Sequence, residues 1–485
     1  MSVISGQEYI HRINQLNTNT WIDGEKVTGK ISEHPAFKGI MKSQAELYDL
    51  QVHPNYSSKM TYSSPLTGNR VGVSYLIPKS KEDLSCRRSM IMEWAALSGG
   101  CMGRSPDYMN TALMTFAASK GLFGDHNPKW EENIWNFYEM AREQDLSFTH
   151  TFLNPQVNRS PYYFEEFEDE IIAAQVIDQN EEGIVIKGAR LLATQGGITD
   201  EIIVFPSGGG LNSHSMSYAF SIPSNTKGLK FICRESFSYR ESPFDHPLAS
   251  RFDEVDAIVV FDHVLVPWNR IFFHNDLTIV GKLYSESSFF PLVLHQVTTR
   301  RQTKLEFLVG LAQTLIDSIH IGEYEHVQGK MSEIIIGLET IKSLLDSSEL
   351  HAKVDRFGTF IPDINPLYVA TTIFPTLYPR YTEILQLLGA SGLVSIPTEK
   401  DFTSVNKRDL ERYLQSTSLP AKERVQLFRL AWDFSMSAFG SRQTLYERFF
   451  FGDPVRLRNN LYKSYERSHC VKRVKDFLGS EKIDE

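Results

Sequence analysis

The spacing of hydrophobic residues changes twice along the chain and predicts three successive regions. Up to about residue 145, apolar residues recur at helical spacing between turns marked by Pro and Gly. In the run WEENIWNFYEMARE, Ile134, Phe137, Tyr138 and Ala141 would lie on one face of a helix. We therefore expect residues 1–145 to form a helical N-terminal domain.

Short apolar runs separated by turns predict strands in the middle of the chain. The runs are DEIIAAQVID, GIVIKGARLLAT, EIIVFP, YAFSIP, LKFICRE and DAIVVFDHVLVP, and an Asn-Glu-Glu-Gly turn joins the first two. No helical pattern separates them, which is typical of an antiparallel sandwich or barrel. We therefore expect a β-domain over residues 146–275.

Helical spacing returns over long segments after about residue 290. One apolar stripe is formed by Leu305, Leu308, Val309, Ala312, Leu315, Ile316 and Ile319. A second is formed by Met331, Ile334, Ile335, Leu338, Ile341 and Leu345. The runs TTIFPTLYPRYTEILQLLG and RVQLFRLAWDFSMSAFG predict further helices. Because long apolar stripes imply a helix bundle, we expect an α+β protein of several domains with a C-terminal bundle over residues 276–485.

Composition and charge exclude several classes of function. The 485 residues hold 50 Lys and Arg against 59 Asp and Glu, for a formal net charge of -9. An acidic protein of this kind lacks the basic face that broad nucleic-acid binding needs. The four cysteines, none in a CxxC pair, are too few for a disulfide framework and suggest no metal site. With no secretion signal and no apolar run of about 18 residues, we expect a cytoplasmic protein that does not bind membranes.

Common nucleotide-binding motifs are also missing from the sequence. The chain has neither GxxxxGK[ST] nor a GxGxxG between a strand and a helix, which argues against a Walker-type NTPase and a Rossmann dinucleotide site. The glycines of PSGGGLNSH, which begins at Pro206, lie between two predicted strands. That position fits a loop better than a phosphate-binding turn.

One segment with candidate binding residues is GGCMGRSPDYMN, residues 99–110. Pro106 predicts a helix that begins near Ser105. Arg104 and Tyr108 are four residues apart, so their guanidinium and phenol groups would lie on the same face of that helix. Taken alone, this spacing is better explained by an Arg–Tyr contact at the surface than by a binding site.

A second candidate segment is FTHTFLNPQVNRSPYY, where the helical pattern gives way to strands. It contains the polar residues His150, Asn154, Gln156, Asn158 and Arg159. Polar, irregular backbone at a domain junction is a common place for small-molecule sites. For His150, a binding role and a hydrogen-bonded position in the core are equally compatible with the sequence.

Six motifs, in this order along the chain, resemble those of one enzyme family. They are MGRSPDYMN, HTFLNPQVNRS, LATQGGITDE, FDHVLVPWNRIFFHND, LLGASGLVSIPTEKDF and FGSRQTLYERFFFGDPVR. The family is that of the oxygenase component of 4-hydroxyphenylacetate 3-monooxygenase, a two-component flavin-dependent monooxygenase. The resemblance spans nearly the whole chain and implies an acyl-CoA-dehydrogenase-like fold. In that fold a helical N-terminal domain precedes an antiparallel β-barrel and a C-terminal four-helix bundle, and the protein is usually a homotetramer.

The resemblance also implies an activity. Oxygenases of this family take reduced FAD from a separate flavin reductase and use molecular oxygen as co-substrate. Through a flavin C4a-hydroperoxide they hydroxylate 4-hydroxyphenylacetate, ortho to its phenol oxygen, to 3,4-dihydroxyphenylacetate. A phenol titrates near pH ~10, as Tyr does. Because its anion is the better nucleophile, the site has to stabilise negative charge on the phenol oxygen.

Site residues follow from this resemblance, position by position along the motifs. Three residues match the positions that surround the phenol oxygen in this family, and we call them the phenol trio. Arg104 would supply a fixed charge, Tyr108 a hydrogen bond, and His150 a base or donor. Ser207 and Gly208 match positions in a substrate lid, residues 206–217, whose backbone holds the substrate carboxylate. The positions that match FAD contacts are His150, Thr151, Phe152, Gln156, Val157, Asn158, Arg159, Thr194, Gly440, Ser441, Arg442 and Gln443.

Three other functions compete with this one. 4-Hydroxybutyryl-CoA dehydratase has the same fold but needs three Cys and one His to hold an iron–sulfur cluster. Here Cys101 and His295 lie near two ligand positions, whereas Ser105 and Gln302 stand where the cluster needs cysteines, so we reject the dehydratase. A same-family hydroxylase of another phenol, such as a chlorophenol or a tyrosine-derived metabolite, would keep the phenol trio. A non-catalytic flavin-binding scaffold would leave the trio without a role.

Overall fold

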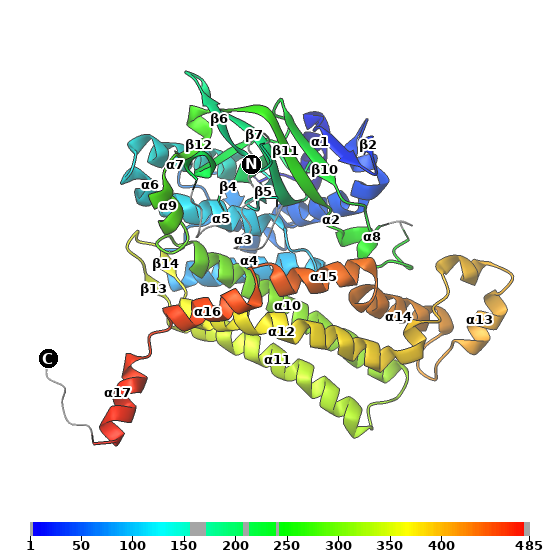
Figure 1. Cartoon of the computed structure of the whole chain (residues 1–485). Coiled ribbons are helices and arrows are strands. Elements are labelled where there is room, and N and C mark those ends of the chain that lie inside the picture. Colours follow the sequence, from blue (N-terminus) through cyan, green and yellow to red (C-terminus); the bar gives the residue numbers. More distant parts are fainter. Residues whose placement is uncertain (1–2, 156–170, 207–212, 239–241, 480–485) are drawn as a thin grey trace.

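The computed structural model describes residues 3–155, 171–206, 213–238 and 242–479 (Figure 1). The chain runs through a helical N-terminal region, two β-sheets and a bundle of long helices. In Figure 1 the sheets lie in the upper part and the bundle in the lower part, and the N-terminal helices lie beside the sheets and between the sheets and the bundle. The order of helices, sheets and bundle predicted from the sequence is confirmed, whereas the domain boundaries near residues 145 and 275 stay predictions.

The helices of the N-terminal region begin and end where local sequence signals place them. They are α1 (Gly6–Leu16), α2 (Pro35–Val52), α3 (Ser57–Met60), α4 (Lys81–Leu97), α5 (Pro106–Ala118), α6 (Gly121–Gly124) and α7 (Pro128–Gln144), with a small hairpin of β3 (Thr61–Ser63) and β4 (Arg70–Gly72). Helix α5 has Ser105 at its N-cap and Pro106 as its first residue. Helix α7 buries Ile134, Phe137 and Tyr138, as their helical spacing predicts.

Two sheets form the middle of the chain. One has six strands in the order β2-β1-β10-β11-β7-β6, and the other has four in the order β12-β9-β8-β5. The strands are β1 (Thr20–Ile22), β2 (Glu25–Lys26), β5 (Phe148–Thr151), β6 (Gln175–Gln179), β7 (Gly183–Thr194), β8 (Glu201–Val204), β9 (Tyr218–Pro223), β10 (Leu229–Cys233), β11 (Asp256–Pro267) and β12 (Ile271–His274). Phe220 of β9 meets Phe261 of β11 edge-on, with 6.3 Å between the ring centroids, so an apolar core joins the two sheets.

The β-region differs from the expected antiparallel barrel in two respects. Within the described residues the two sheets do not join into one closed ring of strands. In addition, β1 pairs with β10 and β5 pairs with β8 in parallel. Each of these pairs joins strands that are distant in the sequence, since a short hairpin cannot connect parallel neighbours. Apolar runs separated by turns predict hairpins and therefore do not reveal such pairs.

The C-terminal region is a bundle of long helices with short connecting elements. It begins with α9 (Leu277–Lys282), whereas the short helix α8 (Ala249–Phe252) lies earlier, between β10 and β11. The elements that follow α9 are α10 (Phe289–Ser318), α11 (Glu325–Leu350), the strands β13 (Lys353–Val354) and β14 (Phe360–Ile361), α12 (Ile364–Gly389), α13 (Lys407–Tyr413), α14 (Ala421–Ser435), α15 (Ala438–Phe449), α16 (Pro454–Ser464) and α17 (Ser468–Phe477). The run predicted as one helix over α14 and α15 is split, because the Ser437 side chain accepts the Gly440 N–H at 3.1 Å and caps α15. Across the described residues, no helix is both long and apolar enough to cross a membrane.

Four charged side chains are buried together where α15 meets α10. The Glu447 carboxylate accepts hydrogen bonds from Arg300 (2.7 and 3.1 Å), Arg301 (3.1 Å) and Lys304 (3.0 Å). None of these four side chains is more than 2% exposed. Burial opposes the ionisation of Glu447, but the three cations outweigh it and hold the pKa of this carboxyl well below its ordinary value. The Glu447 cluster therefore ties α15 to α10.

Removing the carboxylate of the Glu447 cluster should destabilise the protein strongly. Glu447→Gln would leave three cations buried without a counter-ion, which costs about 3–5 kcal/mol of folding free energy. Urea denaturation followed by circular dichroism should show a correspondingly lower midpoint. The matched substitution Glu333→Gln removes an exposed carboxylate that pairs with Arg380 at 2.9 Å, and it should move the midpoint much less. Equal midpoints for the two variants would contradict the role of the cluster.

Candidate active site

The loop before α5 is held from two sides. Gly99 and Gly100 have φ angles of 56° and 72°, and a Cβ on them would lie only 2.8 Å and 2.6 Å from side chains of α10. On the other side, the Glu254 carboxylate accepts the backbone N–H groups of Gly103 (2.8 Å) and Arg104 (2.6 Å). The backbone that carries Arg104 therefore has little freedom.

The guanidinium of Arg104 is buried and has no counter-ion among the described residues. It packs against the adjacent rings of Tyr108 and Phe450, with Cζ 4.4 and 4.5 Å from their centroids. Its Nη1 donates to the hydroxyl of Tyr446 (2.8 Å) and to the carbonyl of Gly103 (3.1 Å). Its Nε is buried and has no hydrogen-bond partner in the part of the chain that the structure describes, and the residue is 8% exposed. Because no carboxylate of the described residues pairs with this cation, the site favours an anionic ligand.

Tyr108 presents its phenol beside this cation, in the first turn of α5. Burial raises the pKa of Tyr108 to about 12, although the charge of Arg104 opposes the rise. Tyr108 therefore keeps its proton at neutral pH and can donate a hydrogen bond. Its ring meets Phe450 edge-on at 5.4 Å and lies 5.8 Å from the imidazole of His150, measured between centroids.

His150 of β5 completes the group and is 1% exposed. Its imidazole lies nearly parallel to the rings of Phe152 (5.5 Å, 18°) and Phe205 (5.7 Å, 12°), and its Nδ1 is buried without a hydrogen-bond partner in the described part of the chain. Burial, assisted by the charge of Arg104, lowers the pKa of His150 well below its ordinary value. At neutral pH the imidazole is therefore uncharged and can accept a proton.

The structure thus brings the phenol trio together in one buried site. Tyr108 comes from the first turn of α5, and His150 comes from a strand that packs beside this helix. Arg104 comes from the loop before the N-cap, Ser105, and therefore does not share a helix face with Tyr108 as its spacing predicted. Their burial excludes a surface contact between Arg104 and Tyr108. The unpartnered Nδ1 of His150 does not fit the alternative of a hydrogen-bonded core histidine. The chemical roles of the three residues remain a proposal, developed below.

Aromatic rings enclose the phenol trio. Phe205 stacks on Phe152 at 6.0 Å and meets Phe116 edge-on, also at 6.0 Å between centroids. Tyr284 stands 6.4 Å from Phe205 and donates its hydroxyl to the carbonyl of Pro206 (2.5 Å), at the start of the glycine-rich segment. An apolar enclosure of this kind excludes water and strengthens the interactions of charged groups inside it.

Two of the predicted FAD contacts, Thr194 and Arg442, meet at one carboxylate. Asp256 accepts the hydroxyl of Thr194 at 2.7 Å and the guanidinium of Arg442 in bidentate fashion at 2.7 and 2.8 Å. Burial opposes the ionisation of Asp256, but Arg442 and Arg234 outweigh it and hold its pKa well below the ordinary value. Nη1 of Arg442 is buried and has no partner among the described residues. A charged donor left free in this way fits a phosphate or flavin carbonyl oxygen, so these residues are compatible with FAD.

The remaining described FAD candidates divide into two groups. Thr151 and Phe152 lie at the end of β5, beside His150, and the Thr151 hydroxyl donates to the carbonyl of Leu191 at 2.8 Å. On α15, Gly440 packs against the backbone of α14, and Ser441 is exposed.

Gln443 uses its polar groups inside the protein. Its amide nitrogen donates to the carbonyl of Cys101, and its amide oxygen accepts from Lys304, both at 2.8 Å. It therefore supports the loop before α5 in this structure. Six further predicted contacts lie outside the described residues, namely Gln156, Val157, Asn158, Arg159, Ser207 and Gly208.

Sequence reasoning missed Tyr446 and Phe450, although both contact Arg104. They lie four residues apart at the end of α15, within the motif FGSRQTLYERFFFGDPVR. That spacing predicts a shared helix face but does not say what the face covers, because Arg104 is 342 residues away from Tyr446 along the chain. Glu254 was missed for the same reason.

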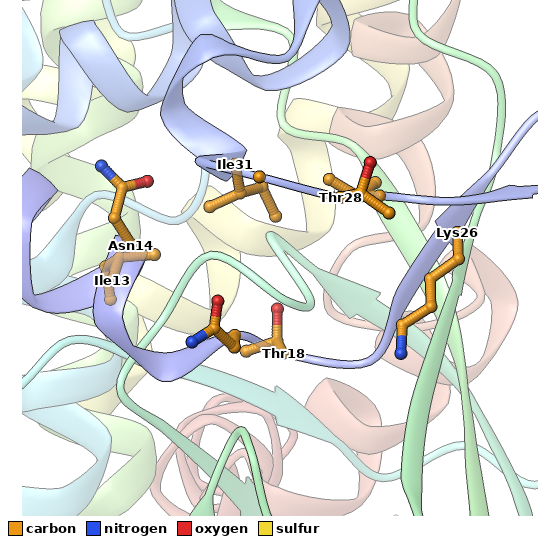
Figure 2. Close-up of a pocket in the computed structure, with 9 residues that line it drawn as sticks. Ile13, Asn14, Thr18, Lys26, Thr28 and Ile31 are labelled. Atoms are coloured by element: carbon orange, nitrogen blue, oxygen red, sulfur yellow. The ribbon is translucent and has the colours of Figure 1, made fainter.

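A separate cavity of about 240 Å³ opens beside α1 and β2 (Figure 2). It is lined by Ile13, Asn14, Asn17, Thr18, Lys26, Val27, Thr28, Gly29 and Ile31. Figure 2 shows Lys26 and Asn14 on opposite sides of this cavity. The cavity contains no residue of the phenol trio, and its lining offers one cation with no second titratable group, so we assign no chemistry to it.

Two family models together match almost all of the chain. Residues 5–273 match the model described as 4-hydroxyphenylacetate 3-hydroxylase N terminal, and residues 280–479 match 4-hydroxyphenylacetate 3-hydroxylase C terminal. The chain belongs to the 4-hydroxyphenylacetate 3-hydroxylase family. The family expected from the six motifs is therefore confirmed.

Relatives within the 4-hydroxyphenylacetate 3-hydroxylase family are similar over their full length. A Bacillus subtilis (strain 168) protein named "Probable 4-hydroxyphenylacetate 3-monooxygenase" is 54% identical over 478 residues, which is 99% of both chains. A crystal structure of the oxygenase component of 4-hydroxyphenylacetate 3-monooxygenase, complexed with FAD and 4-hydroxyphenylacetate, has a TM-score of 0.93 at 43% identity and 98% coverage of both chains.

A 4-hydroxybutyryl-CoA dehydratase from N. maritimus has the same fold, with a TM-score of 0.89 at 20% identity over 100% of this chain and 96% of its own. The side chains do not suit its cluster. His295 Nε2 lies 2.7 Å from the Glu349 carboxylate, and burial raises the pKa of the Cys101 thiol to about 11, which disfavours a thiolate. The rejection of the dehydratase on sequence grounds is consistent with this geometry.

Arg104 should contribute little to folding stability, because no carboxylate offsets the burial of its charge. Arg104→Met should change the folding free energy by less than about 1 kcal/mol. Arg12→Met is the matched comparison, since Arg12 pairs with the largely buried carboxylate of Asp200 at 2.6 Å. It should cost about 2–3 kcal/mol, because that carboxylate would lose its counter-ion. Urea denaturation of both variants gives the comparison, and a larger loss in Arg104→Met would mean that Arg104 is mainly structural.

Proposed function

We propose that this protein is the oxygenase component of a two-component 4-hydroxyphenylacetate 3-monooxygenase, which converts 4-hydroxyphenylacetate to 3,4-dihydroxyphenylacetate. The observation that carries the proposal is the buried guanidinium of Arg104, which lacks a counter-ion among the described residues and lies beside Tyr108 and His150. A phenolate bound there would supply the missing negative charge. Membership of the family and the names of its relatives support the same reaction.

Arg104 would make the substrate reactive by stabilising its anion. A phenol is mostly uncharged at neutral pH, because its pKa lies near ~10. An opposite charge within about 4–6 Å lowers such a pKa by ~1–3 units, and the apolar enclosure strengthens this effect. The ring carbon next to a phenolate oxygen is richer in electrons than that of the neutral phenol and attacks an electrophilic oxygen more readily.

Tyr108 and His150 would share the handling of the phenol proton. Tyr108 keeps its own proton, because its pKa is raised to about 12, and so it would donate a hydrogen bond to the phenol oxygen. His150 is uncharged, because burial lowers its pKa, and its imidazole would accept a hydrogen bond from the phenol hydroxyl. The two groups and Arg104 would thus hold the substrate oxygen and its proton at defined positions.

Reduced FAD, when bound, would supply the electrons that activate molecular oxygen. Arg442 would hold it through its free Nη1, with Thr194 and the end of β5 at Thr151 and Phe152 alongside. A separate flavin reductase belongs to the proposal, since an oxygenase component needs a partner that reduces the flavin. The aromatic enclosure would keep water away from the reacting groups.

The direct test supplies the purified protein with reduced FAD, oxygen and a panel of phenols. We expect 3,4-dihydroxyphenylacetate to form from 4-hydroxyphenylacetate and to be identified by chromatography and mass spectrometry. Preferred turnover of a chlorophenol or a tyrosine-derived phenol would assign the same chemistry to another substrate. The lack of any product that depends on reduced flavin would instead favour a flavin-binding scaffold.

Arg104→Ala and His150→Ala should separate hydroxylation from oxygen consumption. Each removes a group that we place at the phenol oxygen, so the fraction of consumed oxygen found in product should fall at least about tenfold. The remaining oxygen should appear as hydrogen peroxide, measured with an oxygen electrode and a peroxidase assay. The exposed Arg408→Ala serves as the control and should keep its coupling. Full coupling in either site variant would show that its role is assigned wrongly.

The proposal includes a homotetramer and a cytoplasmic location. Helix α17 projects from the body of the chain in Figure 1, and none of its residues is buried. Val471, Val474, Phe477 and Leu478 are exposed and recur at helical spacing. An uncovered apolar helix face suits packing against another copy of the chain. The four cysteines are free, which suits a reducing compartment.

Removing α17 should lower the oligomeric state. We expect a chain that ends at Tyr465 to have a smaller mass than the full-length protein in size-exclusion chromatography with light scattering. The double substitution Val474→Asp with Phe477→Asp should act in the same direction, because it places charge on the apolar face. Lys472→Asp on another face of the helix is the control. An unchanged mass in both altered proteins would rule out a role of α17 in assembly.

A further inference from the structure

One face of α15 runs along the loop that carries Arg104. Gln443, Tyr446, Glu447 and Phe450 are spaced so that they lie on the same side of the helix. Gln443 donates to the carbonyl of Cys101 at 2.8 Å, and Tyr446 lies 3.3 Å from the carbonyl of Gly103. Arg300, bound to Glu447, also donates to the carbonyl of Gly100 at 2.7 Å. The helix therefore contacts the loop at several successive residues.

Within this face, Tyr446 makes the hydrogen bond to the Arg104 side chain. Its hydroxyl accepts from Nη1 at 2.8 Å, and its ring is stacked on Phe450 with 4.7 Å between the centroids. The adjacent rings of Tyr108 and Phe450 pack against the guanidinium, but they form no hydrogen bond to any one of its nitrogens. The bond to Tyr446 holds one particular nitrogen, Nη1, which also donates to the carbonyl of Gly103 at 3.1 Å. Nε and Nη2 are then left for a ligand.

The chain leaves room for this contact at Gly103. A Cβ at this position would lie 2.4 Å from both Cζ and Oη of Tyr446, closer than non-bonded atoms can approach. Glycine at 103 therefore permits the ring of Tyr446 to reach the loop. This is a second observation, independent of the hydrogen bond, that the structure brings Tyr446 and the Arg104 loop together.

We propose that Tyr446 is a positioning residue, whose hydroxyl holds Nη1 of Arg104 so that Nε and Nη2 face the oxygen of the bound phenolate. The inference rests on the proposed function, because it takes a phenolate as the ligand. Tyr446 acts through Arg104 and does not itself touch the substrate oxygen. The Glu447 cluster supports it by fixing α15 on α10 one residue further along the helix.

The test measures the ionisation of a bound phenol in the absence of flavin. The probe is 4-nitrophenol, whose anion absorbs at a longer wavelength than the neutral form, titrated into the purified protein over a range of pH. Wild-type protein should bind the anion preferentially and lower the apparent pKa of the probe. Tyr446→Phe keeps the ring and its stacking and loses only the hydroxyl. We expect it to bind the anion roughly tenfold more weakly, since it loses a hydrogen bond to a charged group.

Two further variants keep the test decisive. Gly103→Ala should give a similar loss, because its methyl group would push Tyr446 away. Tyr378→Phe is the matched control, because Tyr378 is buried in the same bundle and its hydroxyl has no hydrogen-bond partner among the described residues. Its ring centroid lies 4.4 Å from Nζ of Lys304. Anion binding by Tyr378→Phe should equal that of the wild type. Urea midpoints of all variants separate a loss of positioning from a loss of folding.

The outcomes distinguish this inference from the proposed function. If the wild type shows no preference for the 4-nitrophenol anion, the phenolate site itself is wrong. If the wild type shows the preference, and Tyr446→Phe and Gly103→Ala retain it, the phenolate site stands and the positioning role of Tyr446 is overturned. An equal loss in Tyr378→Phe would likewise overturn it, because the effect would not depend on contact with Arg104.

Discussion

The candidate site depends on one constraint, a buried guanidinium that no carboxylate of the described residues neutralises. A cation removed from water needs compensation, and among the described residues Arg104 receives three aromatic rings, one hydroxyl and one backbone carbonyl. That compensation is incomplete, so negative charge is favoured at this position in the structure. The same field acts on the neighbouring groups, since it opposes the raised pKa of Tyr108 and helps to lower that of His150.

The surrounding structure keeps this cation in place. Glu254 binds the backbone of the loop from the side of the sheets, and α15 binds it from the side of the bundle. The Glu447 cluster gives α15 a firm base, because a carboxylate with three cations around it resists separation. The two buried groups of charges thus have different roles. The Glu447 cluster contains its own counter-ion, whereas Arg104 can still bind the negative charge of a ligand.

The comparison with the dehydratase separates fold from chemistry. The two proteins share the arrangement of helices and sheets at 20% identity, yet a cluster that needs three thiolates cannot be assembled from Cys101, Ser105 and Gln302. In place of ligands for a cluster, this chain has a phenol, an imidazole and a guanidinium in an aromatic enclosure. The chemistry therefore depends on a few side chains at the junction of the sheets and the bundle, and the shared scaffold does not decide it.

The sequence alone determined the elements and the local faces of this protein. Helical spacing placed Ile134 and Phe137 in the core, Pro106 set the start of α5, and the short interval along the chain kept Arg104, in the loop before α5, near Tyr108 in its first turn. These features depend on neighbours along the chain, whose geometry is set by the backbone itself. The meeting of Arg104 with Tyr446, the parallel pairing of β5 with β8, and the lack of a counter-ion depend on packing between segments far apart in sequence. Only the tertiary structure decided them, because burial and desolvation are properties of the assembled core and not of any local pattern.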